Sequence, residues 1–299
     1  MGRYCTVRVD DRNITSVLRG KIRQDESMKR FSEPAAVGDD VELSIDSNDE
    51  GLIEKVYERR NVFTRKDKGR KKEDLIAANI GQIVIVLSFY KPAYNLRFSD
   101  RICVRAVKEN IPVLLVVNKS DLSQKSEISY IKKYYKNTGL DIIFTSAKTG
   151  DGIDKLDKKL KGKVSLFTGS SGAGKSSLLN CICPDIDLKI AEISESTGKG
   201  RHTTTNVQMI RSDDKTWLID TPGMREFGLM DITPDELADY FPDFKILSKS
   251  CRFSPCTHDH EPGCEVKNNV DSGNILNDRY ISYLNILQNI RDSYSKMYD

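Results

Sequence analysis

Apolar and polar residues follow two different rhythms along the chain, and the point of change divides it into parts. Up to residue 63, short segments rich in β-branched and aromatic residues alternate partly with polar positions and are separated by turn residues. They run over 4–9, 15–19, 41–45 and 52–57. Closely spaced short strands predict a small all-β barrel, and a barrel of the oligonucleotide-binding (OB) type fits the size, although that fold has five strands. The alternative is a β-domain with no role in nucleic-acid binding.

From Ile83 onward, continuous apolar runs alternate with longer amphipathic stretches, which predicts an α/β domain with a mostly parallel sheet. Strands are expected at 83–87, 113–117, 141–145, 164–168, 207–210 and 216–219. Helices are expected at 98–109, 126–137 and 153–161, and again after residue 176. A capping box at Thr233 predicts a helix that ends near Tyr240. A last helix at 275–297 carries one apolar stripe, made of Ile281, Leu284, Leu287, Ile290 and Tyr294.

The first chemical motif follows the expected strand at 164–168, where residues 169 to 176 match the phosphate-loop pattern G-x-x-x-x-G-K-[ST]. Glycines there allow positive φ and close approach, so that backbone N–H groups point inward at a phosphate beside a helix N-terminus. We expect Lys175 to reach the β- and γ-phosphates and Ser176 to bind Mg²⁺. The expected contact residues are Gly169, Ser170, Ser171, Gly172, Ala173, Gly174, Lys175, Ser176 and Ser177.

Two further motifs indicate that the base is guanine. Asn118, Lys119, Ser120 and Asp121 follow the strand at 113–117 and match Asn-Lys-x-Asp. Asp121 can accept hydrogen bonds from N1–H and the exocyclic amine of guanine, a donor pair that adenine lacks. Asn118 is expected to hold the N7/O6 edge, and Lys119 to lie over the base. After the next strand, Ser146 and Ala147 begin Ser-Ala-Lys, in which the backbone N–H of Ala147 would donate to O6.

A fourth motif completes the set at the end of the strand at 216–219. Asp220 is expected in the second coordination shell of Mg²⁺, and the N–H of Gly223 is expected to contact the γ-phosphate. Of the three threonines at 203–205, Thr204 or Thr205 is expected to bind Mg²⁺ and the γ-phosphate, by its spacing to the strand at Val207. Four motifs at four strand ends predict a GTP-binding enzyme, and they disfavour a metabolic kinase.

The order of these motifs is unusual. Ras-type GTPases run from the phosphate loop to Asn-Lys-x-Asp and then to Ser-Ala-Lys. Here the last two, at 118–121 and 146–148, come first, which is a circular permutation. The same sheet can form because chain ends that lie close together tolerate rejoining. The segment that begins at Gly223 then runs directly into the C-terminal part, which can therefore respond to the γ-phosphate.

Composition and charge indicate where the protein acts and what it can contact. The 299 residues include no apolar run that could span a membrane and no apolar signal core at the N-terminus, so we expect a cytoplasmic protein without a membrane anchor. The net charge of +3 lies in residues 1–72, which hold 17 basic and 14 acidic residues, while the remainder holds 30 of each. Residues 65–72 include six basic residues in eight, which form either a solvated linker or a contact for a phosphate backbone.

Three cysteines near the C-terminus suggest a metal site. Cys251, Cys256 and Cys264 enclose His258 and His260, and thiols in a cytoplasmic protein stay reduced or bind metal. Three thiolates and one imidazole suit a closed tetrahedral zinc site. The spacing leaves both histidines open as the fourth ligand. The alternative is three unrelated thiols.

Together these features resemble the bacterial ribosome small subunit-dependent GTPase A family. The likeness covers nearly the whole chain and rests on the permuted motifs, the leading β-domain, Gly-Arg-His-Thr-Thr-Thr at 200–205, Asp-Thr-Pro-Gly-Met-Arg-Glu-Phe-Gly at 220–228, and C-x4-C-x-H-x5-C. It selects His258 as the fourth zinc ligand. It implies an OB-type barrel at 1–64, a basic linker at 65–80, a circularly permuted GTPase domain at 81–225 and a helical zinc-binding domain at 226–299. One departure is that the chain enters its first strand almost at once, so an upstream strand or basic tail is expected to be missing.

The resemblance also implies a function. It predicts a GTP hydrolase of the cytoplasm that binds the small ribosomal subunit late in assembly, contacts its rRNA, and hydrolyses GTP slowly unless that subunit stimulates it. The expected cofactors are one structural zinc ion and Mg²⁺ bound with GTP, and we expect a monomer. The alternative is a GTP-gated RNA-binding regulator with a target other than the ribosome.

Hydrolysis requires a group that orients the attacking water. In Ras a glutamine just after the Asp-x-x-Gly motif does this, whereas the corresponding residue here is Met224, which cannot. His202 is the one histidine outside the cysteine cluster, and it directly precedes the three threonines. We predict that His202 is the catalytic residue and that docking on the small subunit places it over the γ-phosphate, where it orients or deprotonates the water. The alternative is that His202 contacts an rRNA phosphate.

Overall fold

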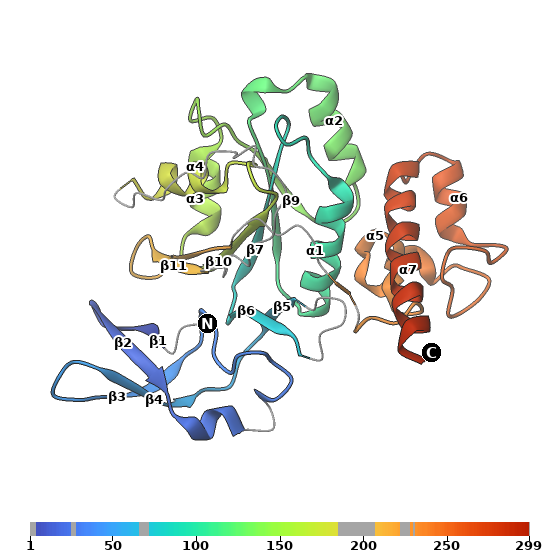
Figure 1. Ribbon diagram of the computed structural model, residues 1–299. Helices are drawn as coiled ribbons and strands as arrows, with labels where there is room; N and C mark the ends of the chain where they lie inside the picture. Colours follow the sequence, from blue (N-terminus) through green and yellow to red (C-terminus); the bar gives the residue numbers. More distant parts are fainter. Residues whose placement is uncertain are drawn as a thin grey trace, which may run out of the picture.

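The structure is a computed structural model that describes residues 4–24, 28–65, 72–184, 207–221, 228, 229 and 231–298. Three parts follow one another along the chain: a strand-rich N-terminal part, a central α/β part, and a helical C-terminal part that packs beside helix α1 (Figure 1). Four of the expected site residues lie outside the described residues, namely His202, Thr204, Thr205 and Gly223.

The N-terminal part is built on a four-stranded sheet. Its strands are β1 (Tyr4–Val9), β2 (Arg12–Leu18), β3 (Val41–Ile45) and β4 (Gly51–Val56), in the order β1-β2-β4-β3, with the 3-10 helix η1 (Gly20–Gln24) after β2. The pairs β1–β2 and β3–β4 are antiparallel, and β2 runs parallel to β4. Ile14, Phe31 and Ile53 are each less than 5% exposed, at 4%, 3% and 2%, which gives this part a small core of its own. All four strands expected from the sequence are present.

A two-stranded hairpin spans the boundary between the predicted barrel at 1–64 and the predicted linker at 65–80. Strand β5 (Val62–Arg65) pairs antiparallel with β6 (Asp74–Ala78), so the predicted linker at 65–80 is wrong for the strand residues in that range. Phe63 and Ala77 are fully buried, and a bridge from Val37 to Ala77 ties the hairpin to the N-terminal part. The apolar segments on both sides of the basic run are short, so their periodicity gives little signal. Residues 66–71 lie outside the described residues.

The central part is a six-stranded sheet, as predicted for an α/β domain. Its strands are β7 (Gln82–Ser88), β8 (Val113–Asn118), β9 (Asp141–Phe144), β10 (Val164–Gly169), β11 (Gln208–Arg211) and β12 (Trp217–Asp220). Their order is β11-β12-β10-β7-β8-β9, and all neighbours are parallel except the edge strand β11. Strand β10 follows β9 in the sequence but inserts between β7 and β12, so the permuted chain still forms one continuous sheet.

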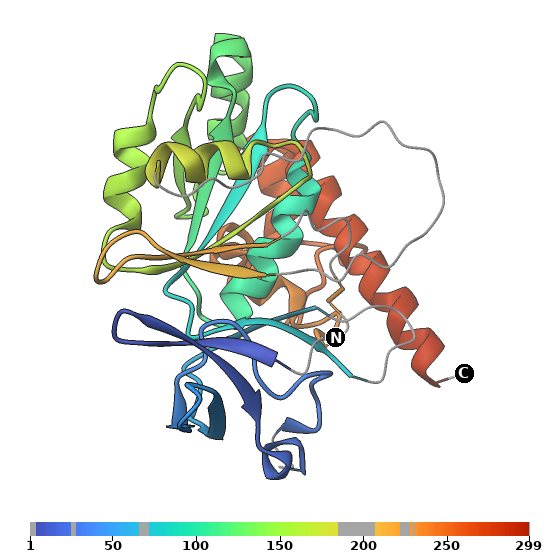
Figure 2. The same cartoon turned by 60° about the vertical axis from the view of Figure 1, so that its left-hand side comes forward.

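Helices cover both faces of this sheet. Helices α1 (Leu96–Lys108) and α2 (Lys125–Tyr134) lie on one face, and α3 (Ile153–Leu160) and α4 (Lys175–Ile182) lie on the other (Figures 1 and 2). Along β7, Ile83 and Ile85 pack in the core on the α1 side, and Val84 and Val86 pack on the α4 side. Successive side chains of a strand point to opposite faces, so a strand covered on both faces is apolar at every position. That requirement explains the continuous apolar runs in the sequence.

The C-terminal part contains the 3-10 helix η4 (Leu237–Tyr240) and the helices α5 (Pro242–Ser248), α6 (Glu265–Asp271) and α7 (Asn277–Tyr298). The helix predicted after Thr233 forms only over its last residues, as η4, which ends at Tyr240 as expected. The capping contact forms, since the N–H of Thr233 donates to Glu236 Oε2 at 2.9 Å, but the chain continues as a turn and then η4. Phe241 is 1% exposed in the core, and this tertiary packing outweighs the local signal and bends the chain before α5.

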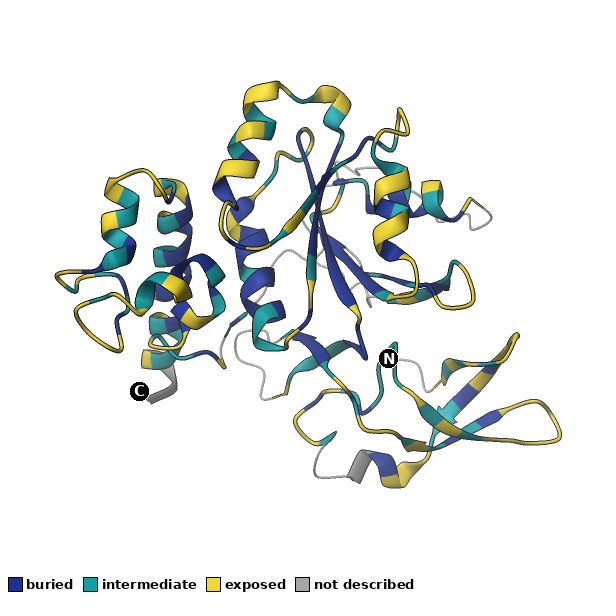
Figure 3. Cartoon of the chain, turned by 180° about the vertical axis from the view of Figure 1, so that it is seen from behind, coloured by how far each residue is buried: buried dark blue, intermediate teal, exposed yellow. Residues whose placement is uncertain are grey.

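Helix α7 forms as predicted, and its buried stripe differs only at the N-terminal end, since Leu284 and Tyr294 are partly buried against the core as expected. Leu287 and Ile290 are 1% and 3% exposed, as expected, whereas Ile281 is 40% exposed. Tyr283 and Ile286 are fully buried instead, and the buried side of the helix faces the other helices of this part (Figure 3). The stripe shifts because the ring of Tyr283 packs against two phenylalanine rings of the η4–α5 segment. Among the described residues, no helix is long and apolar enough to cross a membrane.

Candidate functional site

The four motifs singled out in the sequence meet at one edge of the central sheet. Asn118 ends β8, Gly169 ends β10 and Asp220 ends β12, while Ser146 and Ala147 follow β9. These strands run parallel within one sheet, so their carboxyl ends lie at the same edge. In open α/β sheets the carboxyl edge is where ligands bind.

The loop between β10 and α4 requires its glycines. Gly174, the N-cap of α4, has a φ of +94°, and a Cβ there would lie 2.2 Å from Nδ2 of Asn118. Gly169 has a φ of +150°, and a Cβ there would lie 2.1 Å from the carbonyl oxygen of Val86. The contact at Gly169 is with strand backbone, and relieving the contact at Gly174 would displace the buried amide of Asn118. The loop therefore leads into the N-terminus of α4 along a path that a side chain would block, and that helix end favours an anion.

Lys175 lies across this loop. The residue is 8% exposed, and its Nζ donates to the carbonyl oxygens of Gly169 at 3.0 Å and Ser170 at 3.4 Å. Burial lowers the pKa of Lys175, and the nearby carboxylate of Asp220 opposes that shift. Ser176 and Ser177 occupy the first turn of α4 directly after it. A cation held at the mouth of a loop of N–H groups suits the oxygens of a phosphate chain.

Asn118 connects the end of β8 to the phosphate loop and to the segment after β9. Its Nδ2 donates to the carbonyl oxygen of Ala173 at 3.1 Å, which fixes the phosphate loop to β8. Its Oδ1 accepts from the backbone N–H of Ala147 at 3.1 Å, which fixes the segment after β9. Asn118 is 1% exposed, so this amide is a buried brace in the structure and its side chain already engages both neighbours.

Lys119 is held by three backbone carbonyls, and Asp121 is held by one hydroxyl. Nζ of Lys119 donates to the carbonyl oxygen of Gly172 at 2.9 Å, and to those of Tyr90 at 2.9 Å and Lys91 at 2.6 Å. Oδ1 of Asp121 accepts from the hydroxyl of Ser146 at 2.6 Å, which leaves the other carboxylate oxygen for a ligand. Sequence reasoning missed the segment at 90–91, because it contributes backbone carbonyls, which no side-chain pattern can reveal.

Asp220 supplies a carboxylate near Lys175. Its Oδ1 is buried and has no hydrogen-bond partner among the described residues. Burial raises the pKa of this carboxyl, and Lys175 opposes the shift. A buried carboxylate oxygen without a donor is costly unless a cation or ordered water completes it. The position of Asp220 therefore fits a residue that holds a hydrated metal ion beside a phosphate.

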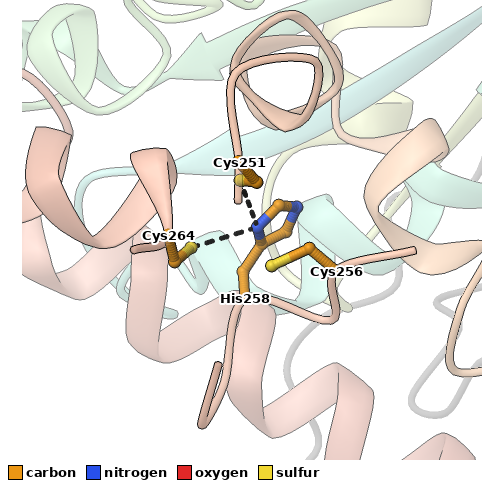
Figure 4. A group of neighbouring side chains, drawn as sticks. All are labelled: Cys251, Cys256, His258 and Cys264. Carbon is orange, nitrogen blue, oxygen red and sulfur yellow. Dashed lines mark hydrogen bonds between the residues drawn. The ribbon is translucent and has the colours of Figure 1, made fainter. Parts of the chain in front are cut away.

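A second site lies in the C-terminal part, where Cys251, Cys256, His258 and Cys264 each offer one ligand atom. These atoms all lie within 4.8 Å of one another. Nδ1 of His258 lies 3.7 Å from Sγ of Cys251 and 3.3 Å from Sγ of Cys264 (Figure 4). Ligands of a tetrahedral zinc ion, with Zn–S bonds of about 2.3 Å, lie roughly 3.5 to 4 Å apart. The donor set and its spacing therefore fit such an ion.

The surroundings of the two histidines favour His258 over His260 as the fourth ligand. His258 is fully buried, and its Nε2 lies 2.9 Å from the hydroxyl of Ser248, so that Nδ1 faces the thiols. Burial lowers the pKa of His258 to about 4, so the ring is neutral at pH 7, the form that binds metal. The side chain of His260 is 76% exposed. The structure thus resolves a choice that spacing alone left open.

Known proteins resemble this chain over most of its length. The model of the family described as RsgA GTPase matches residues 56–230, more than half of the chain. A Chlorobaculum parvum protein named small ribosomal subunit biogenesis GTPase RsgA is 42% identical over 85% of each chain. A Bacteroides thetaiotaomicron protein named small ribosomal subunit biogenesis GTPase RsgA 2 is 36% identical, over 96% of this chain and 94% of its own.

Solved structures extend the similarity to the fold. The crystal structure of YjeQ from Thermotoga maritima matches with a TM-score of 0.74 at 33% identity, over 96% of this chain and 94% of that one. The crystal structure of YloQ, described as a circularly permuted GTPase, matches with a TM-score of 0.70 at 28% identity, over 98% of this chain and 92% of that one. The permuted motif order read from the sequence therefore has a structural counterpart.

Proposed function

The chain belongs to the RsgA GTPase family, and from this premise we propose that it is a cytoplasmic factor that binds the small ribosomal subunit and its rRNA and assists late maturation of that subunit. Membership of the family makes it a GTP hydrolase. The names of its relatives support the ribosomal target. The observation that carries the proposal is the convergence of the phosphate loop, Asn118 and Asp121 at one edge of the sheet.

Each motif has a distinct role in the proposed nucleotide site. Asp121, oriented by Ser146, accepts from N1–H and the exocyclic amine of guanine. The N–H of Ala147, which donates to Oδ1 of Asn118 in the structure, turns to O6 when the base binds. The stem of Lys119 lies over the base while its Nζ stays with the carbonyls that hold it. The phosphate loop from Gly169 to Ser177 surrounds the β-phosphate with N–H groups, and Lys175 turns from its own loop to the β- and γ-oxygens.

Mg²⁺ bound with GTP would neutralise charge on the β- and γ-phosphate oxygens. Ser176 is the residue that would bind it directly, and Asp220 would hold it through water. The unpartnered buried oxygen of Asp220 supports this assignment. Thr204 or Thr205 would add a ligand, and the N–H of Gly223 would contact the γ-phosphate.

The intrinsic hydrolysis rate of the protein is low in this proposal, because the carboxylates described at the sheet edge have other roles, Asp121 toward the base and Asp220 toward hydrated Mg²⁺. Met224 replaces the glutamine that does so in Ras. His202 supplies this function once the small subunit has placed it over the γ-phosphate. The subunit therefore acts as the activator of the reaction as well as its target.

The cysteine cluster binds one structural zinc ion in this proposal. The thiolates of Cys251, Cys256 and Cys264 and Nδ1 of His258 hold it, with the ring oriented by the hydroxyl of Ser248. A closed site of three sulfurs and one nitrogen leaves no open position for substrate, so the ion contributes free energy of folding and takes no part in hydrolysis.

GTP hydrolysis measured with purified small subunits, large subunits and free RNA tests the function. We expect a slow intrinsic rate that rises to saturation with small subunits and changes little with the other two. Stimulation by unrelated free RNA to the same extent would favour a GTP-gated RNA-binding regulator with another target. A rate that small subunits leave unchanged would contradict the proposal.

A further inference from the structure

The C-terminal part contacts the two helices that begin beside the guanine-reading residues. Helix α1 follows the segment whose carbonyls at Tyr90 and Lys91 accept from Nζ of Lys119. Helix α2 begins just after the 3-10 helix η3 (Ser120–Leu122), which holds Asp121. Both helices therefore start at the base side of the proposed nucleotide site, and both run along the face of the sheet next to α7 (Figure 1).

These two helices share one buried polar cluster with α7. Asp100 of α1 is fully buried and pairs with Nη1 of Arg279. The same carboxylate accepts from the hydroxyls of Tyr134 on α2 at 2.6 Å and Ser282 on α7 at 2.5 Å. Nη2 of Arg279 pairs with Asp243 of α5 at 3.0 Å. One guanidinium thus joins α1, α5 and α7, and one carboxylate joins α1, α2 and α7.

Further contacts extend the cluster along α2. The guanidinium carbon of Arg279 lies 5.6 Å from the ring centroid of Tyr134, and the hydroxyl of Tyr130 donates to Asp278 at 2.5 Å. Buried charges are low in free energy only when every one is paired, so a cluster of this kind tolerates a single register of its helices. We call this set the α7 seam: Asp100, Tyr130, Tyr134, Asp278 and Arg279.

We propose that the α7 seam couples the C-terminal part to the base side of the nucleotide site, and that Arg279 is a positioning residue for guanine recognition. The inference rests on the nucleotide site proposed above. The route runs through α1 and α2 to Lys119 and Asp121 and does not involve the γ-phosphate. GTP and GDP carry the same base, so coupling by this route changes the affinity for both by the same factor. Coupling through groups that contact the γ-phosphate would separate the two nucleotides instead.

The double variant Tyr130→Phe/Tyr134→Phe tests the proposal, because it removes both hydroxyl contacts of α2 with the seam and keeps both rings. In equilibrium titrations of the full-length, zinc-loaded protein, we expect the dissociation constants of GDP and of a non-hydrolysable GTP analogue to rise together, about three- to tenfold. Arg279→Lys should shift both in the same direction. Arg291→Lys is the matched control, because Arg291 lies on the same helix but pairs with Asp259 inside the C-terminal part. It should leave both affinities unchanged.

The coupling is reciprocal, since linkage requires that the nucleotide act on α7 as strongly as α7 acts on the nucleotide. GDP and the GTP analogue should slow amide hydrogen exchange over 278–290 equally, and the double variant should lose this protection. Unchanged affinities in the folded double variant, or a loss confined to the GTP analogue, would overturn the coupling and leave the nucleotide site standing. A wild-type protein that binds neither nucleotide would overturn the site and the coupling together.

Discussion

The proposed nucleotide site and the cysteine cluster are held in place in opposite ways. The nucleotide site, called the nucleotide edge below, lies at the carboxyl edge of the central sheet and includes the phosphate loop and residues 118–121 and 146–147. The edge lies on a sheet whose interior strands are buried and mostly apolar, and Asn118 and Lys119 are held there mainly by backbone atoms. Nζ of Lys119 alone donates to three carbonyl oxygens. The cluster lies on a loop between α5 and α6, and its four ligand atoms lie within 4.8 Å of one another.

The two sites differ in what fixes their geometry. At the nucleotide edge, the hydrophobic core of the sheet fixes the strands, and the strands fix the loops, so the geometry is present before any ligand binds. At the cluster, the free energy of binding an ion is itself the free energy that orders the loop. The comparison predicts that the two sites respond very differently to substitution.

The largest expected effect is on the metal. Cys251→Ser or Cys256→Ser should lose stoichiometric zinc, and with it much of the roughly 10–16 kcal/mol of apparent binding free energy that such sites provide. Elemental analysis should show the loss, and hydrogen exchange should rise over 240–270, while GTP affinity stays within about tenfold because the sheet is intact. Cys181→Ser is the control, because Cys181 is an exposed thiol outside the cluster. If elemental analysis finds no zinc in the wild-type protein, the claim that zinc orders the cysteine cluster is contradicted.

The second-largest expected effect is on the subunit-stimulated rate of GTP hydrolysis. His202→Ala should lower the subunit-stimulated rate of GTP hydrolysis by about 10²- to 10⁴-fold, the usual contribution of a proton-transfer group, with nucleotide affinity and subunit binding retained. His260→Ala, at an exposed position, should leave the rate unchanged. Single-turnover rates at saturating subunit concentration make the comparison. Weakened subunit binding with normal stimulated turnover would instead assign His202 to rRNA contact.

The smallest effect is at the junction of the two regions, where Asp231 meets α1. Arg105 donates from Nη1 to Oδ2 of Asp231 at 2.7 Å, and Lys108 lies 2.9 Å from the same oxygen. The Arg105 side chain is 3% exposed. Asp231→Asn leaves this guanidinium poorly compensated and should lower the free energy of unfolding by about 1–3 kcal/mol, less than for a fully buried pair because Asp231 is partly exposed.

The pH dependence of that loss has a definite sign. Burial raises the pKa of Asp231, but Arg105 and Lys108 outweigh it and hold the pKa well below its usual range. A carboxyl with a lowered folded-state pKa stabilises the protein fully above the unfolded pKa, near 4, and loses that contribution as the pH falls further. Urea unfolding of wild type and Asp231→Asn should therefore differ by a constant amount from pH 7 to about 5 and converge below about 4. A difference that widens on acidification would refute this account of the pair.

The sequence was sufficient for the sheet and for the side chains at its edge. The interior strands are mostly apolar runs, interrupted in β10 by Ser165 and Thr168, and each motif begins where a run ends. Strand order could therefore differ from chain order without hiding the site. The permutation was visible for the same reason. His258 needed more than spacing, because both histidines fit the pattern until burial distinguishes them.

The features that the sequence did not reveal depend on tertiary contacts. The carbonyls of Tyr90 and Lys91 hold Lys119 through backbone atoms that any residue would supply. Strands β5 and β6 are too short to show a period, and Phe241 bends a segment that its capping box marks as helical. Arg279 looks like a solvated charge in an amphipathic helix, and only its neighbours from three other helices show why it is buried.

The central claim is that the edge of the sheet hydrolyses guanine nucleotides and that the small subunit activates it. Asp121→Asn tests both parts, because it replaces the acceptor that faces guanine N1–H with an amide that suits xanthine. Hydrolysis of GTP and XTP by this variant should be measured with and without saturating small subunits. The account predicts that GTP turnover falls by a factor on the order of 10² or more and that XTP is hydrolysed with subunit stimulation. A variant that binds and hydrolyses GTP as the parent does would contradict it.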